Sequence, residues 1–140
     1  MGAQDLTFPQ TLKKYIEAAR KAGARPVLLT PVVRRRFENG LLADSHGAYL
    51  TAVRKLAQEE NVPLIDMAAM SEAFFNGVGE EKSKQYFMHL VPGESSNYPE
   101  GAEDDTHFQK RGAEAMAGLA VGGVRELGLP LAASIIKQGK

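Results

Sequence analysis

The sequence predicts an α/β protein in which amphipathic helices alternate with short, buried, parallel strands. Two apolar runs carry this prediction, residues 26–30 and 62–66, each bounded by polar residues, glycine or proline. Between them lies a helical pattern of about 15 residues, so the three segments form a β-α-β unit with a right-handed crossover. The length of 140 residues fits a single domain, 1–140.

The amino-terminal part predicts one helix before the first strand and one helix after it. Thr7 and Pro9 are typical of a helix start, and apolar residues then recur at helical spacing until Gly23. The crossover helix is predicted from a second amphipathic pattern, with Asp44 or Ser45 as its cap.

Further helical patterns follow the second strand. Residues 67–75 and 80–88 predict two helices, and periodic apolar residues over 113–127 predict a last helix that ends at Gly128. Four glycines in or next to this last segment lower its helix propensity, and we interpret them as points of close packing: Gly112, Gly118, Gly122 and Gly123. The tail over residues 131–140 is expected to be frayed.

Two segments lack the spacing of a helix or a strand. Residues 32–40 contain three consecutive arginines and an Asn-Gly pair, which predicts an exposed basic loop. Residues 89–108 are interrupted by prolines and glycines and show no periodicity. An irregular segment of this length inside a compact domain tends to be functional.

The predicted sheet is incomplete, because two parallel strands do not form a stable layer by themselves. The first strand is apolar almost throughout, as a strand covered on both faces is. We therefore expect the chain to be part of a larger parallel sheet. Two alternatives stay open: a partner chain continues the sheet, as in a homo-oligomer, or the chain belongs to a longer enzyme whose amino-terminal strands are missing here.

The composition excludes several classes of function. The chain has 17 Lys+Arg against 17 Asp+Glu, so it lacks the basic excess of a general nucleic-acid or anionic-membrane binder. Its lack of cysteine excludes a thiolate nucleophile, a disulfide framework and cysteine-based zinc sites. The sequence shows neither a membrane-spanning run nor a signal peptide, so we expect a cytoplasmic protein as written, or part of a secreted parent.

The most specific local pattern is Asp104-Asp105-Thr106-His107-Phe108, directly before the last helix. A carboxylate three residues before a histidine on a turn can hydrogen-bond to imidazole Nδ1 and leave Nε2 free as a general base. Asp104 and His107 are therefore the candidate catalytic residues. The competing interpretation is structural, because an aspartate or threonine in such a turn often caps the following helix.

Other polar residues are weaker candidates. Ser45 and His46 are neighbours at a helix start, where their side chains point apart, so a capping role is favoured over a Ser–His pair. Ser95 and Ser96 share the irregular segment with His107 and are the least implausible replacement nucleophiles. The three histidines lack the spacing of a metal site, and we predict no metal and no cofactor.

Several blocks of the sequence occur together in the order of a known enzyme family. They are a helix-to-strand passage and arginine-rich loop (22–36), a helix start (45–49), a strand (62–67), Asn-Tyr-Pro (97–99), the D-x-x-H block (104–108) and residues 125–131. Over residues 7–131 the chain resembles the SGNH (GDSL-type) hydrolases, specifically the rhamnogalacturonan acetylesterase-like group of carbohydrate esterases.

This resemblance implies part of a flavodoxin-like three-layer α/β/α sandwich with a parallel sheet, in which the N-terminal strands are missing. It implies that Asp104 orients His107 and that His107 is the general base for a serine nucleophile. Under the same resemblance Arg34, Arg35 and Arg36 lie just past the end of a strand, where they would bind the carboxylates of an acidic, pectin-like polysaccharide. The alternative for the arginines is a solvated charge run.

The chain departs from the family at the nucleophile. It contains no Gly-Asp-Ser motif, and its six serines lie outside such a context. Two functions are therefore predicted as alternatives. The first is an SGNH-type ester hydrolase, incomplete in this chain, that acts on an acetylated carbohydrate or another small ester. The second is a non-catalytic α/β protein that self-associates through its uncovered strand or serves as a ligand-binding scaffold.

Overall fold

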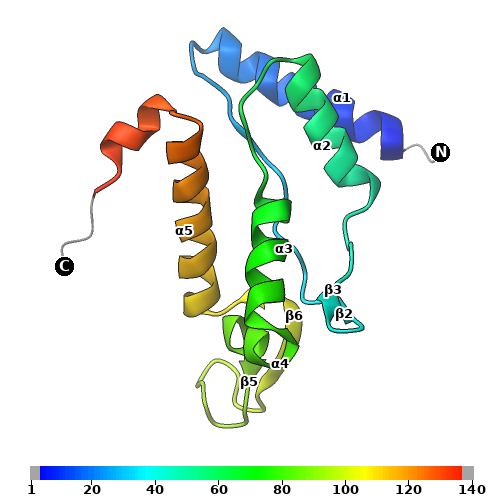
Figure 1. The fold of residues 1–140 in the computed structure, drawn as a ribbon, viewed down its shortest axis with the longest axis vertical. Helices are drawn as coiled ribbons and strands as arrows, with labels where there is room; N and C mark the ends of the chain where they lie inside the picture. Colours follow the sequence, from blue (N-terminus) through cyan, green and yellow to red (C-terminus); the bar gives the residue numbers. More distant parts are fainter. Residues whose placement is uncertain (1–3, 137–140) are drawn as a thin grey trace.

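The computed structural model describes residues 4–136 and has a mixed α/β architecture (Figure 1). The helices are α1 (Gln4–Lys21), α2 (Ala48–Glu59), α3 (Met67–Val78), α4 (Glu80–Ser83), the 3-10 turn η1 (Lys84–Tyr86), α5 (Lys110–Glu126) and the 3-10 turn η2 (Pro130–Ser134). The strands are β1 (Leu28–Leu29), β2 (Phe37–Glu38), β3 (Leu41–Leu42), β4 (Leu64–Ile65), β5 (Phe87–Leu90) and β6 (Ala102–Phe108). Among residues 4–136, no helix combines the length and the apolar character that a bilayer crossing requires.

The two apolar runs pair in parallel, as the β-α-β prediction requires. Leu28 is opposite Leu64 and Leu29 is opposite Ile65. The pairing continues at both ends, because the Leu28 N–H donates to the Pro63 carbonyl at 2.9 Å and the Thr30 N–H donates to the Ile65 carbonyl at 3.2 Å. The α/β fold class with a parallel sheet is therefore confirmed.

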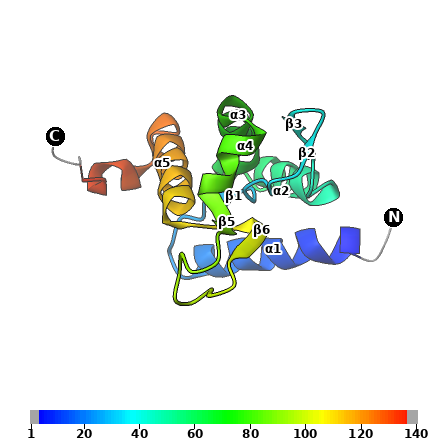
Figure 2. The ribbon, with the colours of Figure 1, turned by 90° about the horizontal axis from the view of Figure 1, so that it is seen from below.

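Helices cover both faces of this strand pair. Leu28 and Leu64 point toward α1 and α2, where they join an apolar cluster formed by Ile16, Val53, Leu56, Ala57 and Val62. Ile65 points to the opposite face and packs on α5 so closely that a Cβ on Gly123 would lie 2.6 Å from its Cγ2 atom. Seen from below, α1 and α5 lie on different sides of β1 (Figure 2).

The expectation that residues 89–108 are irregular is wrong at both ends of the segment. β5 and β6 form an antiparallel pair around the loop 91–101, and α4 and η1 replace the single helix expected over 80–88. β6 escapes prediction because Glu103, two aspartates, a threonine and a histidine give it no apolar alternation. Its anchor is aromatic: the tilted rings of Phe108 and Phe87 have centroids 4.7 Å apart, beside the fully buried Phe75.

Three smaller predictions also need correction. Helix α1 begins at Gln4 rather than at Thr7, so Pro9 lies inside it. The basic loop contains the hairpin β2–β3, whose Asn39-Gly40 turn has φ values of 54° and 82°; an Asn-Gly pair is the usual sequence signal for such a turn. The tail forms η2, and Ile135 packs on the core cluster; the remainder of the tail, residues 137–140, lies outside the described residues.

Candidate catalytic site at Asp104 and His107

The candidate pair lies on a bulge in the β5–β6 ladder. Met88 is opposite Asp104, and the next pair along the ladder is Phe87 with Phe108, so residues 105–107 have no opposite residue. Extra residues on one strand leave the ladder and redirect their side chains. The bulge therefore turns His107 out of the strand pair, and its side chain is 76% exposed.

Asp104 organises this bulge with both carboxylate oxygens. Its Oδ1 atom accepts the backbone N–H groups of Thr106 at 2.7 Å and His107 at 2.9 Å. Its Oδ2 atom accepts a hydrogen bond from His107 Nδ1 at 2.7 Å. The predicted three-residue spacing thus brings the two side chains together, with Nδ1 facing the carboxylate and Nε2 directed away from it.

The same contacts keep the carboxylate ionised. The backbone N–H of His107 contributes most, followed by the Thr106 N–H and the His107 imidazole, and together they lower the pKa of Asp104 from 3.8 to about 2. A permanently charged carboxylate holds the imidazole in one tautomer and stabilises the imidazolium that forms when Nε2 takes a proton. The arrangement has the geometry of a general base with its orienting acid.

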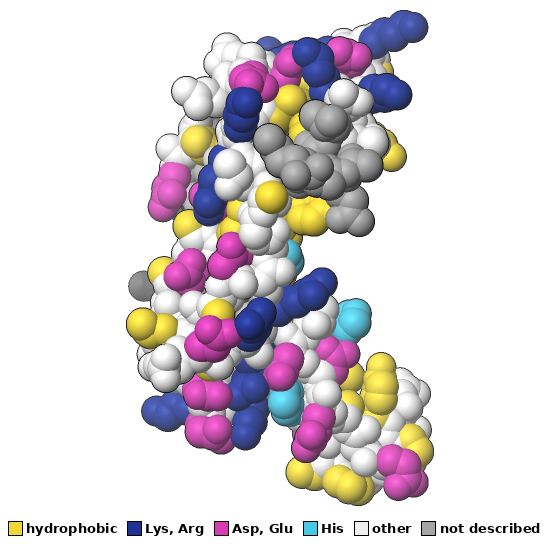
Figure 3. Space-filling model, turned by 90° about the vertical axis from the view of Figure 1, so that its right-hand side faces the viewer, with side chains coloured by type: hydrophobic (Ala, Val, Ile, Leu, Met, Phe, Trp, Pro, Cys, Tyr) yellow, Lys and Arg dark blue, Asp and Glu magenta, His cyan; other side chains and the backbone are white. Residues whose placement is uncertain are grey.

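A second imidazole–carboxylate contact lies directly beside the first. His89 Nε2 donates to Asp105 Oδ1 at 2.7 Å, and Arg35 Nη1 donates to the same oxygen at 3.0 Å. Burial raises the pKa of the Asp105 carboxyl, but the hydrogen bonds from His89 and Arg35 outweigh it and leave the pKa below its ordinary value. Histidine and acidic side chains lie next to one another on this face of the molecule (Figure 3).

The other polar candidates make different contacts, although Ser45 lines the same hollow as Asp105 and Thr106. His46 Nε2 lies 2.8 Å from the Val32 carbonyl, so it donates a proton there and does not accept one from Ser45. The Ser45 hydroxyl is buried, and within residues 4–136 no hydrogen-bond partner for it is found. Ser95 accepts the Asn97 N–H inside its own turn at 3.3 Å. In the same described part of the chain, the His107 imidazole hydrogen-bonds to Asp104 and to no serine hydroxyl.

The three arginines differ in their surroundings. Arg34 and Arg36 are exposed, and Arg36 pairs with Glu38 at 2.7 Å. The Arg35 side chain is 8% exposed and is occupied by protein partners. All three line a hollow of about 450 Å³ together with Phe37, Asp105 and Thr106, the residue next to His107. Over residues 4–136, no group of three or more His, Asp or Glu side chains is arranged to hold a metal ion.

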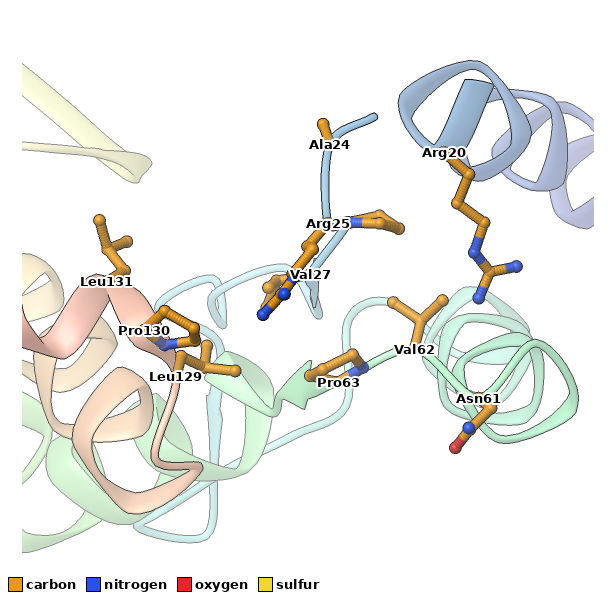
Figure 4. Close-up of a pocket in the computed structure, with 11 residues that line it drawn as sticks. Arg20, Ala24, Arg25, Val27, Asn61, Val62, Pro63, Leu129, Pro130 and Leu131 are labelled. Carbon is orange, nitrogen blue, oxygen red and sulfur yellow. The ribbon is translucent and has the colours of Figure 1, made fainter. Parts of the chain in front are cut away.

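A larger hollow of about 610 Å³ lies away from these residues, at the amino ends of β1 and β4 (Figure 4). Its wall is mainly apolar and includes Val27, Val62, Pro63, Leu129 and Leu131. None of the predicted site residues lines it, so size alone does not indicate where the chemistry lies.

Comparison with known proteins finds two relatives that are named as rhamnogalacturonan acetylesterases. The chain is 48% identical over 132 residues to the probable rhamnogalacturonan acetylesterase YesY and 43% identical over 136 residues to the rhamnogalacturonan acetylesterase RhgT, both from Bacillus subtilis (strain 168). The chain is similar to these two acetylesterases over nearly its whole length. The resemblance predicted from the sequence is therefore confirmed.

These matches take in 94% and 96% of the chain but 57% and 59% of YesY and RhgT, so the chain spans little more than half the length of either relative. The uncharacterized esterase YxiM of the same organism is 27% identical over 124 residues, which is 87% of this chain and 29% of YxiM. The crystal structure of YxiM superposes with a TM-score of 0.73 and 25% identity over 90% of this chain and 32% of that one. No protein-family model matches the chain.

The sequence patterns did not predict one part of the candidate site, the contact of Arg35 and His89 with Asp105. Arg35 and Asp105 are 70 positions apart and His89 and Asp105 are 16 apart. Neither separation follows a helical or strand period, so no local pattern points to these contacts.

Proposed function

We propose that this chain carries the acid–base part of an SGNH-type carbohydrate acetylesterase centre. The observation that carries the proposal is the 2.7 Å hydrogen bond between His107 Nδ1 and Asp104 Oδ2, in a chain whose homologues are named as rhamnogalacturonan acetylesterases. The chain is then the carboxy-terminal part of the catalytic domain.

In this role His107 moves the proton of an acyl-transfer reaction. Its free Nε2 takes the proton of a serine hydroxyl while the serine oxygen forms a bond to the acetyl carbonyl carbon. When the bond between that carbon and the sugar oxygen breaks, the proton passes from Nε2 to the leaving sugar oxygen. Water then attacks the acetyl carbon while Nε2 takes its proton. The bond between that carbon and the serine oxygen breaks, the serine oxygen takes the proton from Nε2, and acetate leaves. Asp104 stays ionised throughout, which its pKa of about 2 supports. We assign the serine to no residue of this chain.

The substrate of this centre is an acetylated carbohydrate or another small ester, by analogy with YesY and RhgT. The hollow lined by the arginines adjoins Thr106 and therefore the base. Arg34 and Arg36 present exposed guanidinium groups there, which suits the carboxylate of an acidic sugar. Arg35 is less suited to bind substrate than the other two arginines, because its guanidinium already donates hydrogen bonds to protein partners.

A second proposal concerns the sheet. Leu29 of β1 is 49% exposed, although its neighbour Ile65 on the same face is buried. A pair of two-residue strands needs further strands to form a stable layer, so we infer that another polypeptide segment or a second copy continues the sheet at β1. Sedimentation velocity at micromolar concentration tests self-association: a dimer supports the second copy, and a clean monomer excludes it.

Turnover of a small chromogenic acetyl ester tests the proposed chemistry. Wild-type chain, His107→Ala and His46→Ala are compared, the last as a matched loss of an imidazole outside the candidate site. Turnover that is lost in His107→Ala and kept in His46→Ala supports the proposal. Equal turnover in wild type and His107→Ala contradicts the role of His107. A wild-type rate no higher than that of free imidazole shows that this chain holds no working nucleophile.

A further inference from the structure

The exposed bulge at residues 105–107 requires an anchor outside itself. The β5–β6 ladder holds the two flanking residues, Asp104 and Phe108, but pairs with none of residues 105–107. Packing does not fix the imidazole either, since the His107 side chain is 76% exposed. The hydrogen bonds from the Thr106 and His107 N–H groups to Asp104 tie the bulge only to the strand residue that precedes it.

The external anchor is attached at the middle of the motif, Asp105. The Asp105 carbonyl accepts the backbone N–H of Arg35 at 2.8 Å. Its carboxylate Oδ1 accepts Arg35 Nη1 at 3.0 Å and His89 Nε2 at 2.7 Å. Asp105 is thus held through both its main chain and its side chain, although its side chain is 51% exposed.

Arg35 is itself firmly held. Its Nε atom donates to the hydroxyl of the fully buried Ser83 at 2.9 Å, and its Nη2 atom donates to the Glu80 carbonyl at 2.9 Å. A guanidinium group presents its donors in a rigid planar fork, so contacts on Nε and Nη2 fix the direction of Nη1. Arg35 therefore connects helix α4 with the bulge.

We propose that Arg35, acting through Asp105, is a positioning residue for the Asp104–His107 pair. Asp104 and Asp105 share a peptide plane, so an anchored Asp105 fixes the backbone from which the Asp104 carboxylate and the 106–107 N–H groups point. Without this anchor the bulge moves as a unit and the Nδ1–Oδ2 hydrogen bond is populated less. The effect on turnover rests on the proposed function, whereas the effect on the hydrogen bond does not.

Asp105→Ala tests the proposal, with Glu103→Ala as the matched control. Glu103 is an exposed acidic residue of the same strand, and its loss removes the same charge. We expect Asp105→Ala to lose the low-field proton resonance of His107 Nδ1–H and to exchange the Thr106 and His107 amide protons about tenfold faster. Arg35→Lys keeps the charge but not the fork, so we expect the same direction of change. Glu103→Ala should leave both signals as in wild type.

The proposal is overturned if Asp105→Ala stays folded and both signals match wild type. Should that variant fail to fold, Asp105→Asn replaces it, because an amide oxygen still accepts a hydrogen bond from Arg35. We expect a smaller change of both signals in the same direction. The absence of any change would overturn the proposal. Where the wild type turns over ester, Asp105→Ala lowers kcat by about 10- to 100-fold with little change in KM. A wild type without turnover shows that this chain holds no working nucleophile for His107, while the two signals still decide the positioning role.

Discussion

Asp104 binds His107 twice, once through the backbone and once through the imidazole. Oδ1 accepts the His107 N–H at 2.9 Å, and Oδ2 accepts Nδ1 at 2.7 Å. The carboxylate therefore fixes both the direction in which the residue leaves the strand and the orientation of its ring. Without these two contacts the exposed His107 side chain would sample several rotamers.

Acid should weaken the fold partly through Asp104. Its pKa is about 2 in the folded protein, below the ordinary value of 3.8, so its contribution to stability is complete above pH 3.8 and disappears as the pH falls through about 2. We expect Asp104→Asn to lose less of its unfolding free energy than wild type between about pH 5 and about pH 2, measured by urea unfolding. Glu103→Gln is the control, and an identical pH dependence in Asp104→Asn and wild type would contradict the assignment.

Replacing two glycines of α5 with alanine should change the unfolding free energy in opposite directions. A Cβ on Gly112 would overlap the Tyr86 carbonyl oxygen and lie 2.6 Å from Phe108 Cδ1, whereas a Cβ on Gly118 would meet open space. We expect Gly112→Ala to cost about 1–3 kcal/mol of unfolding free energy and Gly118→Ala to gain about 0.5–1 kcal/mol from helix propensity. Urea unfolding measures both. A neutral or stabilising Gly112→Ala would show that α5 does not pack on η1 as described.

Short-range patterns predicted most of the fold. The parallel pair β1–β4 and the helix α5 follow from runs and periods in the sequence, and the Asp104–His107 contact follows from a three-residue spacing. Close packing explains Gly112 and Gly123 as predicted, but Gly118 and Gly122 face open space.

The features that escaped prediction depend on long-range contacts. Strand β6 has the composition of a loop and forms because β5 supplies hydrogen-bond partners. The burial of Arg35 in a run of three arginines depends on Asp105, Ser83 and Glu80, which the fold brings to it from two other segments. No neighbour in the sequence distinguishes Arg35 from Arg34.

Arg34 should strengthen the binding of acidic substrates and leave the binding of neutral ones unchanged. Its side chain is exposed at the hollow that adjoins Thr106, where a sugar carboxylate would meet it. If the chain turns over acetyl esters, we expect Arg34→Ala to raise KM about 3- to 10-fold for an acetylated uronate oligosaccharide and to leave KM for a neutral chromogenic ester unchanged. Arg25→Ala, which removes an arginine from the other hollow, is the control. Equal effects on both substrates would exclude a carboxylate-binding role.

The tautomer of His107 is the most direct test of the acid–base pair. Imidazole ¹⁵N chemical shifts of the wild-type chain, recorded with the ring in its neutral form, report which ring nitrogen carries the proton. We predict a proton on Nδ1 and a bare Nε2 in wild type, and a loss of this preference in Asp104→Ala. A proton on Nε2 in the folded wild type would leave the ring without a free base on its exposed side and would contradict the proposed role of Asp104 and His107.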